Sequence, residues 1–404
     1  MHTVEITLEQ VLLARDRRVQ RQQALHRQYG GTLLSFTMNI AGPVKDTPLV
    51  RLAFRAGLAA LDRDLGAPVH RESVAAPTGP EALLVYHRPA GAVKDLCLRL
   101  EEQAPVGRLY DLDVLSPGGE KLSRPQSRRC LICGGPVTVC SRSRAHGLAA
   151  IQAKTEDILR SFAAGHLAQL ARQALEDEVC LTPKPGLVDR RNSGSHTDMD
   201  SFTFMSSAAS LYPYFEACTR TGRKTADGPA PETFATLRPL GCEAEGEMLA
   251  ATHGVNTHKG AIFSIGIVCA ALGRLDRAVW ADPARVLAEV STMTAGLTAK
   301  DFAGVTAENA VTAGQKLYVQ YGITGVRGQV EAGLPAVLEF GLPALEKGLA
   351  AGYSLNQSGC GALLAIIANS TDTNLIARSD RATQLAVVEE LDGFIEDYCR
   401  ALGL

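Results

Sequence analysis

The distribution of apolar residues changes near residue 148, and this change limits the folds open to the chain. Before it, short runs of strand-forming residues alternate with segments of helical period; after it, helical segments dense in alanine, leucine and glutamate follow one another. A sheet covered by helices and a helical bundle need different cores, so the pattern predicts two domains. The length of 404 residues agrees, because a single core rarely serves more than about 300 residues. We predict domains of residues 1–164 and 165–404.

The first domain is expected to be a mixed α/β fold. Residues 5–29 have a roughly helical apolar period and a basic face, which indicates an amphipathic helix with that face in water. Residues 32–40 are strand formers that end before Gly42 and Pro43. Further helices are expected at residues 47–65 and 92–102, and further strands at residues 83–87 and 108–115.

The second domain is expected to be all-α helical. Its segments of helical period are separated by loops that contain glycine or proline. The candidate helices are residues 151–180, 201–219, 232–252, 261–275, 283–298, 306–321 and 382–402.

Charge and composition exclude several classes of protein. Lysine and arginine number 41 against 43 acidic residues, and the net charge of −2 gives no long-range attraction to nucleic acid or to an anionic membrane. Apolar residues make up 46% of the chain, which excludes a disordered protein. We find no export signal and no apolar run of about 18 residues, so we expect a cytoplasmic protein without nucleic-acid or membrane partners. A homo-oligomer remains open.

An Asp-x-Asp motif is the first candidate site. In residues 108–115, strand alternation puts Asp111 and Asp113 on one face. Two carboxylates at that spacing can hold Mg²⁺ against a polyphosphate, as nucleotidyl transfer requires. The alternative is a half-buried strand with a polar face in water. Nearby cations suited to phosphate are Lys45, Arg51, Arg55, Arg108, Arg124, Arg128 and Arg129.

A cysteine group follows the motif. Cys130, Cys133 and Cys140 have the spacing C-x2-C-x6-C, and His146 comes six residues later. Three thiolates and an imidazole could close a tetrahedral Zn²⁺ site, which would be structural because no position is left for a substrate. The alternative is a set of reduced thiols that pack as small apolar residues.

The second domain carries polar clusters in its loops. Residues 182–200 contain two prolines and two glycines that prevent a helix, beside many polar groups. The cations there are Lys184, Arg190 and Arg191, and the candidate ligands or proton acceptors are Asp189, Asn192, His196, Asp198 and Asp200. The alternative is a hydrophilic connection between helices.

A second cluster, residues 251–260, precedes an apolar helix whose first backbone amides, with Lys259, suit a phosphate. Glu243 and Glu247 are four residues apart, so they share a helix face and could meet Mg²⁺ or a hydroxyl proton; two carboxylates on a wet face are the alternative. Asp372, in residues 370–374 near Arg378, could add another carboxylate.

These motifs resemble two known families. Residues 35–45 (SFTMNIAGPVK), 108–114 (RLYDLDV) and 129–133 (RCLIC), with residues 140–142 and His146, resemble the holo-citrate lyase synthases called CitX. Residues 182–189 (TPKPGLVD), 192–199 and 254–260 (GVNTHKG) resemble the triphosphoribosyl-dephospho-CoA synthases called CitG. The first resemblance covers nearly all of residues 5–165 and the second about 165–404, so the chain is similar to a natural fusion of the CitXG type.

The resemblance implies a two-step reaction. In the C-terminal domain, the ribose 2′-hydroxyl of 3′-dephospho-CoA would attack C1′ of the ATP ribose, and adenine would leave. In the N-terminal domain, a serine of the apo acyl carrier (γ) subunit of citrate lyase would attack the innermost phosphate of that product, with release of pyrophosphate. ATP and dephospho-CoA are then substrates, Mg²⁺ is the expected cofactor and the carrier subunit is the expected partner. The similarity also implies a nucleotidyltransferase-like N-terminal fold.

It further implies residue roles. Asp111 and Asp113 would hold Mg²⁺, Glu243 and Glu247 are a second possible Mg²⁺ pair, and Asp198 or Glu243 would act as base. Substrate and phosphate contacts are expected from Asn39, Lys45, Arg51, Arg108, Lys184, Asp189, Arg190, Asn192, His196, Asn256, His258, Lys259 and Asp372. Two alternatives remain open: only one half is active, or the chain is a non-catalytic adaptor whose basic N-terminal helix docks the acidic carrier subunit.

Overall fold

The computed structural model describes residues 4–184, 186–371, 376 and 380–388. The chain divides into two compact units, residues 1–163 and 164–404, called here the first and the second unit. Helix α5 (Leu148–Cys180) supplies residues to both. Among the described residues, no helix is both long and apolar enough to cross a membrane.

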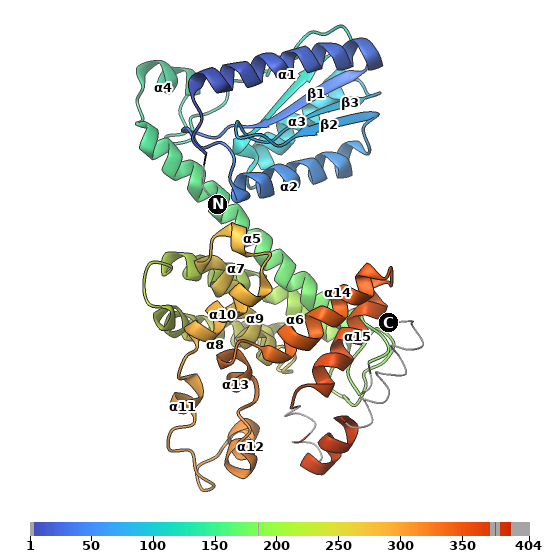
Figure 1. The fold of residues 1–404 in the computed structure, drawn as a ribbon, viewed down its shortest axis with the longest axis vertical. Coiled ribbons are helices and arrows are strands. Elements are labelled where there is room, and N and C mark those ends of the chain that lie inside the picture. The colour runs from blue at the N-terminus through green and yellow to red at the C-terminus, as the bar shows by residue number, and fades with distance from the viewer. Residues whose placement is uncertain (1–3, 185, 372–375, 377–379, 389–404) are drawn as a thin grey trace. The chain divides into compact units, whose positions relative to one another are not determined.

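The first unit is built on a four-stranded antiparallel sheet in the order β2-β3-β1-β4. Helix α1 lies over one face, and α2 and α3 lie over the other (Figure 1). A short 3-10 helix precedes β4, and a short α-helix contains Cys140 of the cysteine group. The elements are α1 (Leu8–Tyr29), β1 (Thr32–Met38), α2 (Pro48–Leu65), β2 (His70–Val74), β3 (Glu81–Tyr86), α3 (Ala90–Gln103), η1 (Gly107–Leu109), β4 (Tyr110–Leu115) and α4 (Val137–Ser143).

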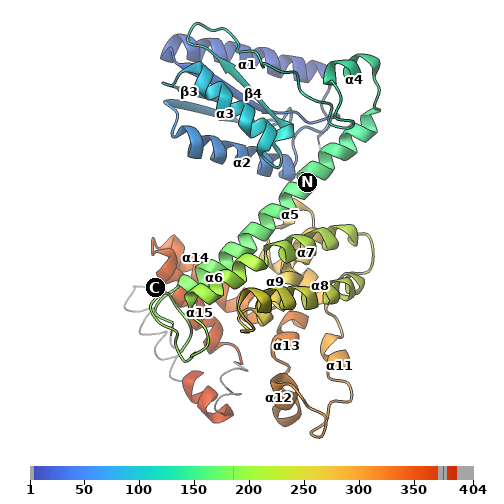
Figure 2. The same ribbon diagram turned by 180° about the vertical axis from the view of Figure 1, so that it is seen from behind.

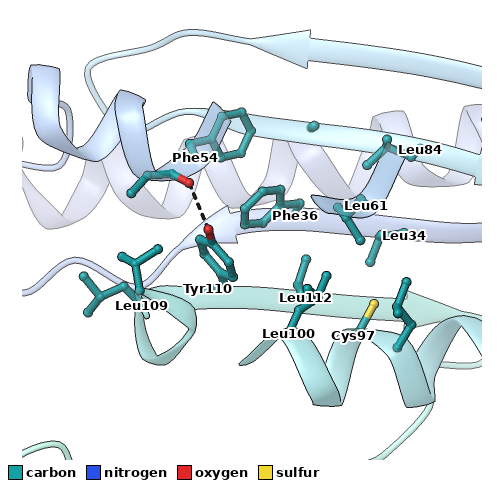
Figure 3. Packing of buried hydrophobic residues seen from close by; sticks show 14 of the residues in the cluster. Leu34, Phe36, Phe54, Leu61, Leu84, Cys97, Leu100, Leu109, Tyr110 and Leu112 are labelled. Carbon is teal, nitrogen blue, oxygen red and sulfur yellow. Dashed lines mark hydrogen bonds between the residues drawn. The ribbon is translucent and has the colours of Figure 1, made fainter. Parts of the chain in front are cut away.

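The main core of the first unit lies between the sheet and helices α2 and α3 (Figure 3). Phe36 of β1 stacks on Phe54 at a ring-centroid distance of 4.5 Å and meets Tyr110 edge-on at 5.2 Å. The Tyr110 hydroxyl donates a hydrogen bond to the Ala53 carbonyl (3.1 Å), which ties β4 to α2. Because alternate β4 residues enter this core, the aspartates between them share the opposite face, which α1 covers. The prediction that the two aspartates share a face is confirmed.

A capping box at Thr7 starts helix α1, and Gly30 caps its C-terminal end. The prediction that its basic face lies in water is wrong in part. Arg18 donates to Glu81 (2.7 Å) and Arg21 to Glu72 (2.8 Å), both on the sheet. The difference arises because Glu72 and Glu81 lie on strands that the fold places beside the helix. The local sequence of the helix gives no sign of these partners.

The described part of the second unit is helical and contains no strand. In the view from behind, α7, α8 and α9 lie together, with α14 beside α15 (Figure 2). The elements after α5 are α6 (Ser201–Ser210), α7 (Tyr212–Lys224), α8 (Ala230–Ala251), α9 (Lys259–Arg274), η2 (Arg277–Val279), α10 (Pro283–Met293), α11 (Leu297–Asp301), α12 (Ala313–Tyr321), α13 (Gly325–Glu331), the π-helical η3 (Val337–Gly341), α14 (Leu342–Ala350) and α15 (Leu355–Ala368).

Several element predictions need correction. The predicted helix 201–219 is two helices that meet at Leu211, and helix 306–321 begins only at Ala313, where Thr312 provides the cap. The predicted helix 283–298 ends at Met293, before the left-handed Gly296. Strand β2 and helices α4, α13 and α14 were missed. Residues 382–388 are helical, and the rest of the predicted helix 382–402 lies outside the described residues.

Close packing of α7 against α9 depends on two glycines. A Cβ at Gly222 would collide with the carbonyl oxygen of Ala270, and one at Gly273 would collide with that of Thr219. Backbone cannot yield as a side chain can, so we expect Gly222→Ala to lower the free energy of unfolding by about 1–3 kcal/mol. Gly246→Ala is the matched control, because its Cβ would meet nothing within 4 Å; it should stabilise α8 by about 0.5–1 kcal/mol. Urea unfolding measures both, and equal stability of the two variants would contradict the packing account.

Candidate functional site

The acidic pair of the first unit, Asp111 and Asp113, lies on the α1 face of β4 with side chains 48% and 34% exposed. Asp111 Oδ1 lies 3.5 Å from Arg128 Nη2, and Asp113 Oδ2 accepts a hydrogen bond from Lys121 Nζ at 2.6 Å. Thr37 Oγ1 donates to Asp111 Oδ2 at 3.5 Å. The pair therefore presents accessible carboxylates beside two cations, a set of groups that suits a metal-bound polyphosphate.

A third carboxylate, Glu81, shares this face, and sequence reasoning missed it. Thr37 pairs with Glu81 on one side and with Asp111 on the other, so the three side chains form a row across β3, β1 and β4. Glu81 is buried and forms ion pairs with Arg18 and Arg21. Burial lowers the pKa of Arg18, while the charges of Asp111 and Asp113 raise it in opposition. Only the strand register reveals this row.

Most of the other cations predicted for the first site have structural partners. Lys45 Nζ donates to the Ile40 carbonyl, and Arg51 makes a two-pronged contact with Asp46 (2.7 and 2.5 Å). Arg108, which is close to the acidic pair in sequence, donates a hydrogen bond to the Arg129 carbonyl. The side chains of Asn39, Arg55 and Arg129 are exposed. Arg128 and Lys121 are thus the cations that contact the pair directly, and Lys121 was not predicted.

The cysteine group converges. One donor atom from each of Cys130, Cys133, Cys140 and His146 lies within 4.8 Å of all the others, so the cluster could hold a metal ion.

In the second unit, Asp189 organises the loop of residues 182–192. Its carboxylate is buried and accepts hydrogen bonds from Thr182 Oγ1 (2.6 Å) and from the backbone N–H groups of Arg191 (2.7 Å), Asn192 (2.9 Å) and Lys184 (3.3 Å). Burial raises the pKa of Asp189, but these hydrogen bonds outweigh it and lower the pKa to about 2. The loop is therefore built around a permanent negative charge.

Helix α15 holds the start of this loop. Asn356 accepts a hydrogen bond from the backbone N–H of Thr182 (3.0 Å) and donates one to its carbonyl (2.8 Å). Lys184 is also buried; its Nζ donates to the Glu178 carbonyl (2.8 Å) and carboxylate (2.6 Å) at the end of α5. The loop is thus fixed at both α5 and α15.

His258 precedes the first residue of α9 and lies within the influence of the Lys184 charge. His258 is buried, and its pKa is lowered to about 4. Burial is the larger cause and the positive charge of Lys184 the smaller. Thr257 Oγ1 donates to Ser207 Oγ (2.7 Å), which lies 2.7 Å from His258 Nδ1. The Ser207 hydroxyl and His258 Nδ1 therefore share a hydrogen bond, which joins α6 to the start of α9. Ser207, on α6, was not predicted, because only the fold brings α6 to α9.

The neutral state of His258 has a consequence for stability. Its pKa is about 4 in the folded protein and about 6.5 unfolded, so the unfolded chain takes up the proton first as the pH falls. The stability present above pH 6.5 is lost towards pH 4, and we expect about 2 kcal/mol of that loss between pH 7 and pH 5. His258→Asn, which keeps a hydrogen-bonding side chain, should lack this part of the pH dependence. Urea unfolding at both pH values measures the difference, and equal pH slopes would contradict it.

The remaining predicted residues of the second unit line its exposed loops and helix faces. Lys259 begins α9 and its Nζ forms an ion pair with Glu245, while its N–H donates to Asn256 Oδ1 (3.4 Å). His196 Nδ1 lies 3.8 Å from Asp198 Oδ1. Asp200 caps α6. The side chains of Arg190, Arg191, Asn192, Glu243 and Glu247 are exposed, and Asp372 and Arg378 lie outside the described residues.

Comparison with known proteins assigns a family to each unit. Residues 6–162 match the family model described as CitX, apo-citrate lyase phosphoribosyl-dephospho-CoA transferase. Residues 164–401 match the model described as CitG, ATP:dephospho-CoA triphosphoribosyl transferase.

Curated relatives span both units. The Protein CitXG of Haemophilus influenzae is 39% identical over 345 residues, covering 81% of this chain and 74% of the relative. The Protein CitXG of Leuconostoc mesenteroides subsp. cremoris is 34% identical over 402 residues, covering 94% and 85%. The 2-(5''-triphosphoribosyl)-3'-dephosphocoenzyme-A synthase of Pectobacterium atrosepticum is 38% identical over 237 residues, covering 58% and 75%.

Proposed function

Because the chain belongs to the CitX and CitG families, we propose a site for each of its two activities. One site is the acidic pair of the first unit, Asp111 and Asp113, and the other is formed by the polar loops of the second unit, residues 182–200 and 251–260. The chain is a bifunctional transferase: the CitG part is a triphosphoribosyl-dephospho-CoA synthase, and the CitX part transfers phosphoribosyl-dephospho-CoA to apo-citrate lyase. The observation that carries the residue assignment is that each unit has its own cluster of cations and carboxylates.

In the second unit, Lys259 and the first backbone N–H groups of α9 would hold the ATP triphosphate, since a helix start favours anions. This fixes the ribose so that the 2′-hydroxyl of dephospho-CoA can reach C1′ as adenine leaves. Asp198 or Glu243, both exposed carboxylates, would accept the hydroxyl proton. His258, which is neutral at pH 7, can orient a phosphate by a hydrogen bond but adds no charge.

In the first unit, Asp111 and Asp113 fit a Mg²⁺ site because both carboxylates are accessible and on one face. Bound there, Mg²⁺ would neutralise charge on the attacked phosphate and on the departing pyrophosphate. Arg128 and Lys121 would contact the phosphate oxygens. The acceptor would be a serine hydroxyl of the acyl carrier subunit of citrate lyase.

No step is assigned to the cysteine–histidine cluster, because four protein ligands leave no open position for a substrate. The cytoplasmic location, the absence of nucleic-acid and membrane partners, and a homo-oligomer stay predictions.

A reconstitution experiment tests the proposal. The protein is incubated with ATP, Mg²⁺ and dephospho-CoA and assayed for free adenine; apo carrier subunit is then added and assayed for pyrophosphate and for a mass increase on one serine. We expect both products, and chelation of Mg²⁺ should stop pyrophosphate release when the finished intermediate is supplied. A non-catalytic adaptor would give neither product, and one active half would give only one.

A further inference from the structure

The cysteine–histidine cluster has the dimensions of a zinc site. The Sγ atoms of Cys133 and Cys140 are 3.5 Å apart, and the four donor atoms lie within 4.8 Å of one another. With Zn–S bonds of about 2.3 Å and Zn–N bonds of about 2.0 Å, the corners of a tetrahedron are roughly 3.5–3.8 Å apart. His146 Nε2 is shielded from solvent and has no hydrogen-bond partner among the described residues. A metal ion would supply the missing partner.

The backbone around the cluster is folded to present the sulfurs. Cys130 and Gly135 are joined by a hydrogen bond from the Cys130 N–H to the Gly135 carbonyl (2.6 Å), and Gly134 turns the chain at φ 70°. Backbone N–H groups of Cys133 and Ile132 point at the Cys130 sulfur. The short helix α4 then brings Cys140 back to this turn.

The segment that carries the cluster has almost no hydrophobic core. Within residues 126–147, all of which the structure describes, Cys130 is the only buried residue. Ile132 and Val139 are 37% and 60% exposed. A segment that buries so little apolar surface needs a cross-link to hold one conformation, and metal ligation is such a cross-link.

This segment also carries a residue of the transferase site. Arg128, two residues before Cys130, donates to the Tyr110 carbonyl (2.8 Å) and to buried Glu101, and it lies 3.5 Å from Asp111. The Arg128 carbonyl accepts from the Val137 N–H (3.2 Å), so the segment bearing Arg128 is joined to the far side of the cysteine turn.

We propose that Cys130, Cys133, Cys140 and His146 bind one structural Zn²⁺, and that this metal holds Arg128 in place beside Asp111. Arg128 is a positioning and phosphate-binding residue, and the zinc acts through it. The transferase activity of the first unit then requires zinc, and the synthase activity of the second unit does not. The coupling rests on the proposed function of the Asp111 site, whereas the zinc site itself stands on the geometry of the cluster.

The test compares the full-length protein with two cluster variants after purification under reducing conditions. We expect one zinc per chain by elemental analysis, and a visible absorption band of tetrahedral cobalt–thiolate after exchange with Co²⁺. Cys133→Ser should lose the metal. Its rate of carrier labelling from supplied intermediate should fall at least tenfold, while its adenine release is unchanged. His146→Cys, which keeps four ligands, should retain both the metal and the labelling. Cys242→Ser, an exposed cysteine outside the cluster, is the matched control.

The outcomes separate the two parts of the proposal. Failure of the wild-type protein to contain or take up Zn²⁺ or Co²⁺ would overturn the metal site. Full labelling by a metal-free Cys133→Ser protein would overturn the coupling to Arg128. Because metal content is measured without either activity, an error in the proposed function would leave the first result intact. Unchanged adenine release shows that the second unit of the variant is folded, and the labelling by His146→Cys shows that a substitution in the cluster does not by itself unfold the first unit.

Discussion

Replacing Asp113 or Asp111 by asparagine should stop labelling of the carrier subunit while adenine release continues at the wild-type rate. Asparagine keeps the shape of the side chain but removes the charge that a Mg²⁺ ion needs. Loss of the metal removes several kcal/mol of transition-state stabilisation, so we expect labelling to fall at least about a thousandfold. The measurement is the mass increase on the carrier serine with the finished intermediate supplied.

The matched control is Asp62→Asn. Asp62 is a partly exposed carboxylate of the same unit that is also paired with an arginine, Arg71, but lies on α2. The Asp62→Asn protein should label the carrier at the wild-type rate. Loss of both activities in Asp113→Asn would show that the two sites are not separate, and normal labelling would remove Asp113 from the reaction.

Replacing Lys259 by alanine should have the reverse effect. Lys259 lies at the first turn of α9, where its charge adds to the anion preference of the helix start. A charge-assisted hydrogen bond to phosphate contributes about 1.5–3 kcal/mol, so kcat/KM for adenine release should fall about 10- to 100-fold. Transfer of supplied intermediate to the carrier should be unchanged. Initial rates at several ATP concentrations measure the effect.

The ion pair between Lys259 and Glu245 provides the control for this prediction. If Lys259 acted only through that pair, Glu245→Gln would impair adenine release as much as Lys259→Ala does. We expect Glu245→Gln to retain activity, because it frees the lysine for phosphate without removing its charge. Equal loss in the two variants would assign Lys259 a structural role.

The parts of the first site that depend on local pattern could be predicted from sequence. Alternation alone placed Asp111 and Asp113 on one face of β4, and the spacing of the cysteines and His146 indicated a cluster that the fold brings together. Glu81 and Lys121 could not be found in this way. Glu81 meets Asp111 only through the register of β3, β1 and β4, and Lys121 reaches Asp113 through the turn after β4.

The second unit shows the same limit. The sequence indicated its helical class, and the loop of residues 182–200 with residues 254–260 marked the polar region. Ser207 and Asn356 were missed because each lies in an ordinary helix far along the chain from its partner, His258 or Thr182. The burial of Lys184 and Asp189 was also missed, because a polar loop gives no local signal of which charges fold inward.

The central claim, that one chain holds two separate catalytic sites, is tested most directly by mixing two variants that are each impaired in a different activity. Asp113→Asn supplies a working second unit and Lys259→Ala a working first unit, so together with ATP, Mg²⁺, dephospho-CoA and apo carrier subunit they should label the carrier well above the sum of the two proteins assayed alone. If the mixture labels no more carrier than that sum, the account of two independent sites is contradicted.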